Sequence, residues 1–488
     1  MTMTVFHLTR LTPPHVPLSR TSALIALTAL ATLVLASCAV TKLDPPVPAA
    51  APAQFKELGL WQRASSVPTA VPDDWWKLFN DPVLDDLEGK LVLGNENLKV
   101  AISQVAQAHA SLDASRAAQW PTLGAGLSAT RNVSAGGAAS SNPNNSSGPN
   151  DSVSLTANAS WEIDLWGRLA QASSASEARL QAGVDDLASA KLSAQALLAQ
   201  SYFSMRTFEA QQALYERNLT AYTRSLTLTQ ARYDAGVVGR TDVLQAQTQL
   251  KNAQAQLAEA VAQRAQMEHA IAVLLGRAPS VFAVARTTAL PDTPAVPVLL
   301  PSVLLQRRPD IAAAARRVAA AYAQIGVANA AFFPSLTLST SAGYRGSSIS
   351  NLISAPNLLW SIGPSLAQGL LDGGARRAAS AQARASADQA SATYRQVVLT
   401  ALQEVEDNLV LADQLHGAAQ LQREALALAE TTLTITNAQY REGTVSYLNV
   451  VSAQTAALSS ELSLLSIRSR ELNAVNQLLK NIAGRWQQ

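Results

Sequence analysis

The sequence is short of cysteine, of aromatic side chains and of charge. It has one cysteine, and aromatic residues make up 5% and charged residues 15% of its 488 positions, although 48% are hydrophobic. A single cysteine excludes a disulfide framework. Ala, Leu, Gln and Ser make up the difference, a composition that favours long helices packed through small side chains. We therefore expect long helices rather than the two to four globular domains that this length would otherwise suggest.

Neither sign of charge is in excess once the N-terminal segment is set aside. The chain has 37 basic and 35 acidic residues, and residues 1–37 hold Arg10 and Arg20 but no acid. A neutral chain has no electrostatic footprint for nucleic acid or for an anionic surface. We expect no nucleic-acid partner.

The residues that metal sites and enzymes require are scattered. The five histidines show no metal-ligand spacing, and Met205 and Met267 form no soft-metal cluster. The pairs Asp85–Asp86 and Asp185–Asp186 are typical of solvated helix faces rather than of paired catalytic carboxylates. No Ser/His/Asp arrangement or phosphate-binding glycine loop is present. We expect no metal, no cofactor and no enzymatic activity.

The N-terminus has the pattern of an export signal. An apolar run over residues 21–36 follows Arg20 and predicts a signal peptide over residues 1–37. Residues 35–38 resemble the bacterial lipobox, in which the cysteine becomes the new N-terminus and carries a diacylglycerol and an acyl chain such as palmitate. The alternative is a lone cysteine at the end of a signal. Since Ala39 is not the aspartate associated with inner-membrane retention, we expect a lipoprotein of the outer membrane anchored through Cys38.

No segment after Cys38 approaches the 18 apolar residues of a transmembrane helix, so any spanning has to be done by strands. Residues 153–165 alternate strictly between apolar and polar side chains, over a length that crosses a bilayer as a tilted strand. Trp161 and Trp166 fit an interfacial aromatic girdle. A further strand is expected around residues 358–366. The alternative is an edge strand of a soluble sandwich.

Two stretches of the chain match each other without a gap. Residues 231–248 align on residues 438–455, offset by 207, with eight of eighteen positions identical. Near-continuous helix is expected over residues 168–234 and 82–118. Residues 241–275 carry a coiled-coil seam in heptad register, and the same register recurs 207 residues later but is weaker towards the C-terminus. A repeat of this length predicts one structural unit used twice.

Each unit has the predicted order helix, two-strand hairpin, long helix, glycine turn, helix. The expected boundaries are 1–37 for the signal peptide, 38–54 for a lipidated linker, 55–276 for the first repeat with its hairpin over 120–166, 277–300 for the inter-repeat linker, 301–483 for the second repeat with its hairpin over 334–370, and 484–488 for a C-terminal tail.

Four membrane strands cannot span a bilayer alone, because their two edges would leave backbone groups unpaired in hydrocarbon. Two chains would give eight strands and three would give twelve, and barrels of both sizes exist. Side chains fill an eight-stranded barrel, so a conduit favours three chains.

Several motifs together resemble one family. They are Leu305–Ile311, Ile325–Gly326, Phe332–Leu336, Trp75–Trp76, Asp164–Arg168 and Leu371–Gly374. The chain resembles the TolC-like outer-membrane factors over residues 55–485, in particular the NodT-like lipoprotein branch that serves resistance-nodulation-division pumps. The resemblance implies a mainly α fold with membrane β: a homotrimeric 12-stranded outer-membrane β-barrel continued by a long periplasmic α-helical coiled-coil barrel with a mixed belt near its middle. It also implies a periplasmic adaptor and an inner-membrane transporter as partners, and a role in multidrug resistance.

In this family the two glycine turns lie at the periplasmic tip, where the tunnel closes and opens by an iris-like untwisting. The matching positions here are Arg232, Asp234, Gly236, Arg240, Asp242, Arg441, Glu442, Gly443, Tyr447, Leu448, Asn449 and Ser452. Lipoprotein members often place an aspartate where this chain has Ser452, so the acidic ring of the family is in doubt here. Asp242 or Glu442 are candidate substitutes, and Leu448 is a candidate apolar constriction. The alternative is that these residues only cap helices and solvate the turn.

We therefore predict a passive outer-membrane channel that completes a tripartite efflux pump and exports small molecules. The competing interpretations are an outer-membrane duct for a type I protein exporter and a lipid-tethered periplasmic coiled-coil scaffold. Cys38 and Arg307–Asp310 argue against the exporter.

Overall fold

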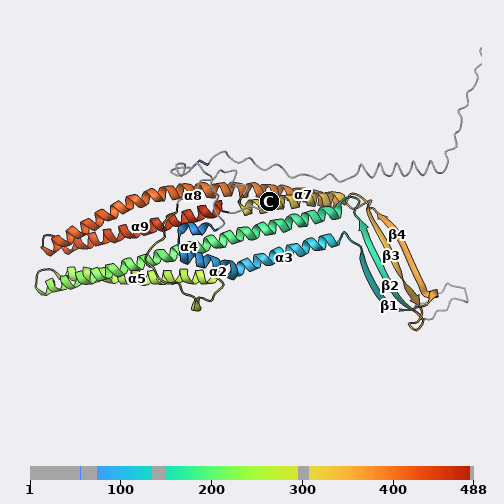
Figure 1. Cartoon of the computed structure of the whole chain (residues 1–488), viewed down its shortest axis with the longest axis horizontal. Coiled ribbons are helices and arrows are strands. Elements are labelled where there is room, and N and C mark those ends of the chain that lie inside the picture. The colour runs from blue at the N-terminus through green and yellow to red at the C-terminus, as the bar shows by residue number, and fades with distance from the viewer. Residues whose placement is uncertain (1–54, 57–73, 134–148, 295–306, 484–488) are drawn as a thin grey trace, which may run out of the picture. The chain divides into compact units, whose positions relative to one another are not determined.

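The computed structural model describes residues 55–56, 74–133, 149–294 and 307–483 (Figure 1). The predicted signal peptide, Cys38 and its linker lie outside the described residues, as do the tail after residue 483 and part of the inter-repeat linker. The described residues divide into two compact units, one with residues 116–133, 149–173 and 323–383 and the other with residues 55–56, 74–115, 174–294, 307–322 and 384–483. Each unit is described by itself below.

The first unit contains an antiparallel four-stranded sheet. Its strands are β1 (Thr122–Asn132), β2 (Asn150–Ile163), β3 (Ser335–Gly346) and β4 (Leu358–Ala367), hydrogen-bonded in the order β1-β2-β3-β4. Strand β2 covers most of the stretch whose alternation predicts a strand. Although β2 and β3 are far apart in the sequence, they pair along eleven positions from Val153↔Gly346 to Ile163↔Leu336. A sheet of two sequence-distant hairpins results.

Long helices make up most of the rest. The helices are α2 (Pro82–Gly94), α3 (Glu96–Ala117), α4 (Arg168–Asp234), α5 (Arg240–Leu274), α7 (Pro309–Ala330), α8 (Ala375–Arg441) and α9 (Tyr447–Ile482), with short 3-10 turns η2 (Trp75–Phe79), η3 (Pro279–Val281) and η4 (Ala355–Asn357). Helices α4 and α8 each have 67 residues, and α5 and α9 have 35 and 36. In each half of the chain, two strands precede a 67-residue helix, a glycine turn and a shorter helix.

The prediction of one helix over residues 82–118 is wrong, because Asn95 divides it. The Asn95 side chain accepts a hydrogen bond from the Leu98 amide (3.0 Å) and donates to the Leu274 carbonyl (2.8 Å). It therefore caps α3 and ties the break to the end of α5. The backbone of Gly94 passes so close to Leu275 that a Cβ there would lie 2.2 Å from the carbonyl oxygen. The local cap and this tertiary contact together explain why the helix stops here.

The heptad seam of α5 faces inward as expected. Val243, Ala246, Ala253, Ala260 and Ile271 are buried. The expectation that the seam of α9 weakens towards its C-terminus is wrong, because that end is the most buried part of the helix. Its polar member Glu471 is 5% exposed, and its carboxylate lies 3.0 Å from Nδ1 of His416 on α8. A partner on the neighbouring helix makes a polar residue compatible with the core.

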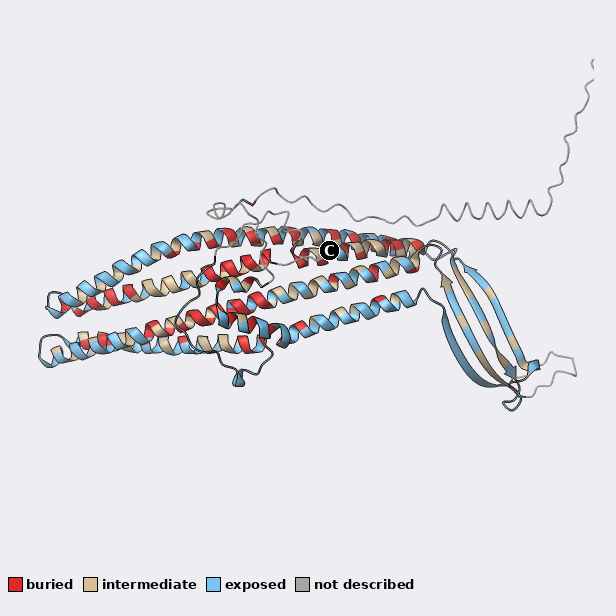
Figure 2. Ribbon diagram, in the orientation of Figure 1, coloured by how far each residue is buried: buried red, intermediate tan, exposed pale blue. Residues whose placement is uncertain are grey.

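The main core lies where η2 and α2 pack among the middle of α4 and α8 and the ends of α5 and α9 (Figure 2). Trp75, Leu84 and Leu91 are fully buried there, with Tyr202 and Phe203 of α4. By length and composition, α9 would be able to cross a membrane, contrary to the expectation that no such segment follows Cys38. Its Ala, Leu, Val and Ile residues raise the mean hydropathy of α9, but serine, threonine and amide side chains interrupt the apolar run. The C-terminal end of the helix belongs to this core.

Candidate functional site

The sheet has one apolar and one polar face. Directly paired residues lie on the same face of an antiparallel sheet, so the register assigns every strand position. The apolar face carries Leu123, Ala125, Leu127 and Ala129 of β1, Val153, Leu155, Ala157, Ala159, Trp161 and Ile163 of β2, Leu336, Leu338, Thr340, Ala342 and Tyr344 of β3, and Leu358, Trp360, Ile362, Pro364 and Leu366 of β4. Arg131, Asp151 and Gly346 lie on the same face at the hairpin ends of the strands. Several of these side chains are openly exposed, among them Leu123 at 79% and Trp360 at 72%.

The opposite face is lined by small and hydroxyl-bearing side chains. It carries Thr122, Gly124, Gly126, Ser128 and Thr130 of β1, Ser152, Ser154, Thr156, Asn158, Ser160 and Glu162 of β2, Ser335, Thr337, Ser339, Ser341, Gly343 and Arg345 of β3, and Leu359, Ser361, Gly363, Ser365 and Ala367 of β4. Hydroxyl pairs bridge neighbouring strands at Ser128–Ser154 and Ser341–Ser361, both at 2.8 Å. A sheet of this kind separates an apolar medium from water.

In the sheet of the described residues, each outer strand pairs on one side only, so β1 and β4 both present an open edge. An open edge exposes unpaired backbone groups and is a template for pairing with another strand. Both edges are long, with 11 residues in β1 and 10 in β4.

Two acid–base pairs fix the places where strands turn into helices. Asp164 accepts a hydrogen bond from the Ala170 amide (2.8 Å), and Arg168 makes a bidentate pair with Glu162. At the other junction Asp372 accepts from the Gly374 and Arg376 amides and pairs with the Arg376 guanidinium at 2.6 Å. These bonds hold the pKa of Asp372 down at about 2. Each aspartate therefore stabilises the first turn of a 67-residue helix.

Trp166 connects the first junction to the start of β3. Its ring stacks on Phe333 with centroids 4.7 Å apart, and its indole nitrogen donates to the Pro334 carbonyl at 2.6 Å. Two of the motifs that resemble the family, Asp164–Arg168 and Phe332–Leu336, thus meet in this unit and connect the two hairpins.

The two glycine turns of the helical unit have the same backbone motif. The Gly236 amide donates to the Tyr233 carbonyl and the Val237 amide to that of Arg232, and the same bonds run from Gly443 to Tyr440 and from Thr444 to Gln439. This is the Schellman arrangement, which needs a left-handed residue after the helix. Gly236 has φ 74° and Gly443 has φ 78°, a conformation that glycine adopts without strain.

Arg232 joins one turn to the other. Its two terminal nitrogens donate to the carbonyls of Tyr440 (2.7 Å) and Arg441 (2.6 Å), the last residues of α8, and its guanidinium lies 4.7 Å from the centre of the Tyr440 ring. Tyr440 and Tyr447 are buried together with Ala246 and Val450. Burial raises the pKa of the Tyr447 hydroxyl, which accepts a bond from Ser225. Tyr447 therefore packs inside the single chain rather than presenting a free ring at its tip.

The other predicted tip residues lie on the surface. Leu448 is 56% exposed, Asp242 is half-buried, and Asp234 accepts a bond from Gln230. The hydroxyl of Ser452 donates to the Leu448 carbonyl at 3.0 Å within α9. Besides Leu448 and the two glycines, the exposed members of the set are Asp234, Arg240, Arg441, Glu442, Asn449 and Ser452.

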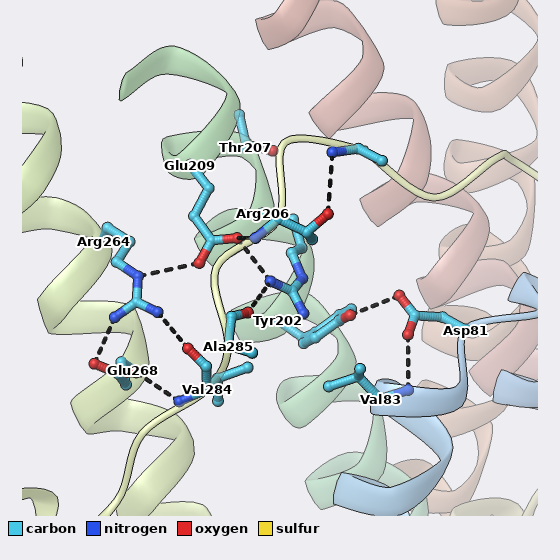
Figure 3. A network of polar contacts seen from close by, with 12 residues as sticks. Asp81, Val83, Tyr202, Arg206, Thr207, Glu209, Arg264, Glu268, Val284 and Ala285 are labelled. Atoms are coloured by element: carbon cyan, nitrogen blue, oxygen red, sulfur yellow. Dashed lines mark hydrogen bonds and ion pairs between the residues drawn. The ribbon is translucent and has the colours of Figure 1, made fainter. Parts of the chain in front are cut away.

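A buried ionic network in the helical unit escaped the sequence analysis (Figure 3). Glu209 of α4 is fully buried and pairs with Arg206 (2.7 Å) and with Arg264 of α5 (3.1 Å), which also pairs with Glu268 (2.6 Å). Both guanidinium groups donate to backbone carbonyls of the segment after η3, Arg206 to Ala285 and Arg264 to Val284. The network fastens that segment to α4 and α5. Its one sequence signal was the charge of Arg264 within an apolar heptad seam.

Among the described residues, no group of three or more His, Cys, Asp or Glu side chains could hold a metal ion. The titratable group that stands out is Glu88, which is 0% exposed. Burial, with a smaller contribution from Asp85, raises the pKa of its carboxyl to about 9. Neither of its oxygens has a hydrogen-bond partner within the described part of the chain.

Solved structures match this architecture. The outer-membrane channel OprN superimposes with a TM-score of 0.84 at 29% sequence identity, over 92% of this chain and all of OprN. The fold is therefore that of an outer-membrane channel: mainly helical, with a membrane-type sheet.

The sequence comparisons point to the same class. The solvent efflux pump outer membrane protein SrpC of Pseudomonas putida is 30% identical over 86% of this chain and 89% of its own length. The pyoverdine export outer membrane protein OpmQ of Pseudomonas aeruginosa is 29% identical over 94% and 96%. The outer membrane efflux protein family matches residues 89–277 and 300–484. The chain belongs to this family, and its function is efflux at the outer membrane, as the sequence predicted.

Proposed function

We propose that three copies of this chain form a passive duct that completes a tripartite efflux pump. The observation that carries the proposal is the four-stranded sheet with one apolar face, one polar face and two open edges. Pairing β4 of one copy with β1 of the next removes both edges and turns every apolar face towards lipid. Three copies give twelve strands, and the small side chains of the polar face then line an open pore.

The helical parts support the same assembly. The 67-residue helices α4 and α8 are each about 100 Å long at 1.5 Å per residue, long enough to continue the pore as a tunnel into the periplasm. The equal helix lengths and the shared Schellman turns support an internal duplication, with one helix hairpin from each repeat in the tunnel wall. Energy for export comes from an inner-membrane transporter coupled through a periplasmic adaptor, and the duct itself catalyses no reaction and needs no cofactor.

The names of the relatives indicate a broad class of cargo. Proteins named for the efflux of organic solvents and for the export of pyoverdine are similar to this chain, so small organic molecules are the proposed cargo. Lipids on Cys38 would anchor each copy to the outer membrane in addition to its strands.

We place the gate at the two glycine turns, with different roles for the residues around it. Arg232 and Tyr447 hold the turns of one copy together, since their side chains are engaged within the chain. Leu448 and Asp242 have the accessible side chains that can close the pore against other copies. With Ser452 bonded to its own helix, an apolar constriction at Leu448 is favoured over an acidic ring.

The test is to purify the full chain and a Cys38→Ser variant from membranes in mild detergent. We expect both to migrate as heat-sensitive trimers with strand signal in circular dichroism, because the strands hold the protein in the membrane without the lipid. Light scattering supplies the copy number. A Cys38→Ser variant that is a water-soluble monomer would contradict the duct and support the tethered scaffold.

A further inference from the structure

The strands of the sheet contain only four charged residues: Arg131, Asp151, Glu162 and Arg345. Three of them are neutralised. Arg131 and Asp151 are directly paired across β1 and β2, with 3.4 Å between Nε and the carboxylate, and Glu162 pairs with Arg168 at 2.7 Å. Among the described residues, no carboxylate pairs with Arg345.

The register places Arg345 on the polar face of the sheet. It is paired with Ser154, which in turn is paired with Ser128, and the three form one row across β1, β2 and β3. The flanking Tyr344 and Gly346 belong to the apolar face, and Arg345 itself is exposed. The row lies towards the hairpin ends of the strands, away from the junctions with the helices.

No acidic residue is available nearby to compensate this charge. The segments between the paired strands, residues 133–149 and 347–357, contain no charged side chain. Asp151 is the one acid at this end of the strands, and the register puts it on the apolar face beside Arg131. The hairpin end of the polar face therefore has one uncompensated positive charge per chain.

We propose that Arg345 forms a ring of three positive charges in the outer part of the pore and that this ring favours the passage of anionic solutes, such as small carboxylates and phosphates. The inference rests on the trimeric duct proposed above. Rings of charged side chains set the preferred sign of the ions that pass a pore. Because Glu162, the other charged residue that the strands place on this face, is paired with Arg168, the ring is the main uncompensated charge within the sheet.

The effect is bounded by screening. The Debye length is about 8 Å at physiological ionic strength, so three arginines act on solutes that pass close to the wall, and we expect a change of roughly two- to threefold in the permeability ratio of chloride to potassium. Neutral solutes would still pass through the pore. The positive ring would lower the electrostatic barrier for anions that leave through the outer mouth.

The experiment measures reversal potentials of the open-channel current in planar bilayers under a KCl gradient. Arg345→Gln is expected to shift selectivity towards potassium and Arg345→Glu to shift it further. The matched control is Arg131→Gln, which removes the same charge from the opposite face of the same sheet and is expected to leave the reversal potential unchanged.

A chemical variant tests the same charge without relying on those substitutions. In channels of Arg345→Cys, a positively charged methanethiosulfonate reagent should restore the chloride preference and a negatively charged one should increase the potassium preference, while both leave the wild-type channel unaltered. A reversal potential that does not change with the charge at position 345 would contradict the proposed ring without contradicting the proposed duct. A folded protein that gives no channel current with any variant would instead contradict the proposed duct.

Discussion

At the residue scale, Glu88 links the stability of the helical unit to pH. Its carboxyl is fully buried without a partner among the described residues, and burial raises its pKa to about 9. The acid is therefore neutral in the folded protein at pH 7 and ionised in the unfolded chain. A raised pKa contributes stability at low pH that is lost as pH rises from the unfolded value of about 4.5 towards 9, at about 1.4 kcal/mol per pH unit.

We predict that Glu88→Gln weakens this pH dependence. The melting temperature of the wild type should fall between pH 5 and pH 8.5, and that of the variant should fall much less, because an amide has no proton to lose. Circular dichroism melts in detergent provide the measurement. The control is Asp86→Asn two residues earlier, where the carboxylate is exposed and paired with Lys90. Equal pH slopes for the wild type and Glu88→Gln would contradict the assigned ionisation.

Arg232 is the residue that couples the two turns, since it donates to two carbonyls across the helical unit. We predict that Arg232→Ala raises the local opening of both turns, because charge-assisted bonds of this kind are worth about 1–2 kcal/mol when half-exposed. Hydrogen exchange of the peptides around residues 226–242 and 438–447 should become faster in the variant. Arg224→Ala, an exposed arginine on the same helix, should leave both peptides unchanged. Exchange that accelerates only in the first turn would refute the coupling.

At the scale of elements, the turns show that glycine can be required by the backbone conformation and not by a lack of room for a side chain. Gly236 and Gly239 lie three residues apart, and neither would bring an added Cβ into a clash. They differ in backbone: Gly236 has φ 74°, whereas Gly239 has φ −79°. We predict that Gly236→Ala destabilises the turn by about 1 kcal/mol and that Gly239→Ala does not, with hydrogen exchange at the end of α4 as the readout. Equal effects of the two substitutions would exclude the Schellman turn as their cause.

The periodicity of apolar residues predicted burial correctly wherever the buried face could be identified from a single helix or strand. The alternation before Trp166 identified a strand with one apolar face, and the heptads of α5 identified the residues that turn inward. Contacts between distant elements were not visible in this way. The break at Asn95 depends on the carbonyl of Leu274, and the buried charge of Glu209 depends on Arg264. Neither partner lies within the window over which a sequence pattern is read.

At the scale of the whole molecule, the proposed duct has a pore that is closed by residues at the glycine turns. We predict that Leu448→Ala raises ion conductance in planar bilayers several-fold, because truncating an exposed apolar side chain at the turn widens an apolar constriction. The control is Leu428→Ala, which removes a leucine that is even more exposed (70%) from α8 away from the turn. Unchanged conductance in Leu448→Ala, with the trimer intact, would leave Leu448 as a turn residue only.

Local order in the chain was enough to establish the lengths of the longest helices, the two-faced strands, the glycine turns and, through its motifs, the family. Those features depend on neighbours a few residues away, because helices and strands repeat over short distances. Folding decided which hairpins share a sheet, that Tyr440 of the second turn is buried whereas the equivalent Tyr233 of the first is exposed, where a helix is interrupted and which charges neutralise each other. Only the folded structure distinguishes the two arginines of the strands. Arg131 is paired with Asp151 on the apolar face, whereas Arg345 has no acid beside it on the polar face. The physical reason is that a side chain's burial and charge balance depend on what packs against it in space, and here those groups come from strands far apart in the sequence.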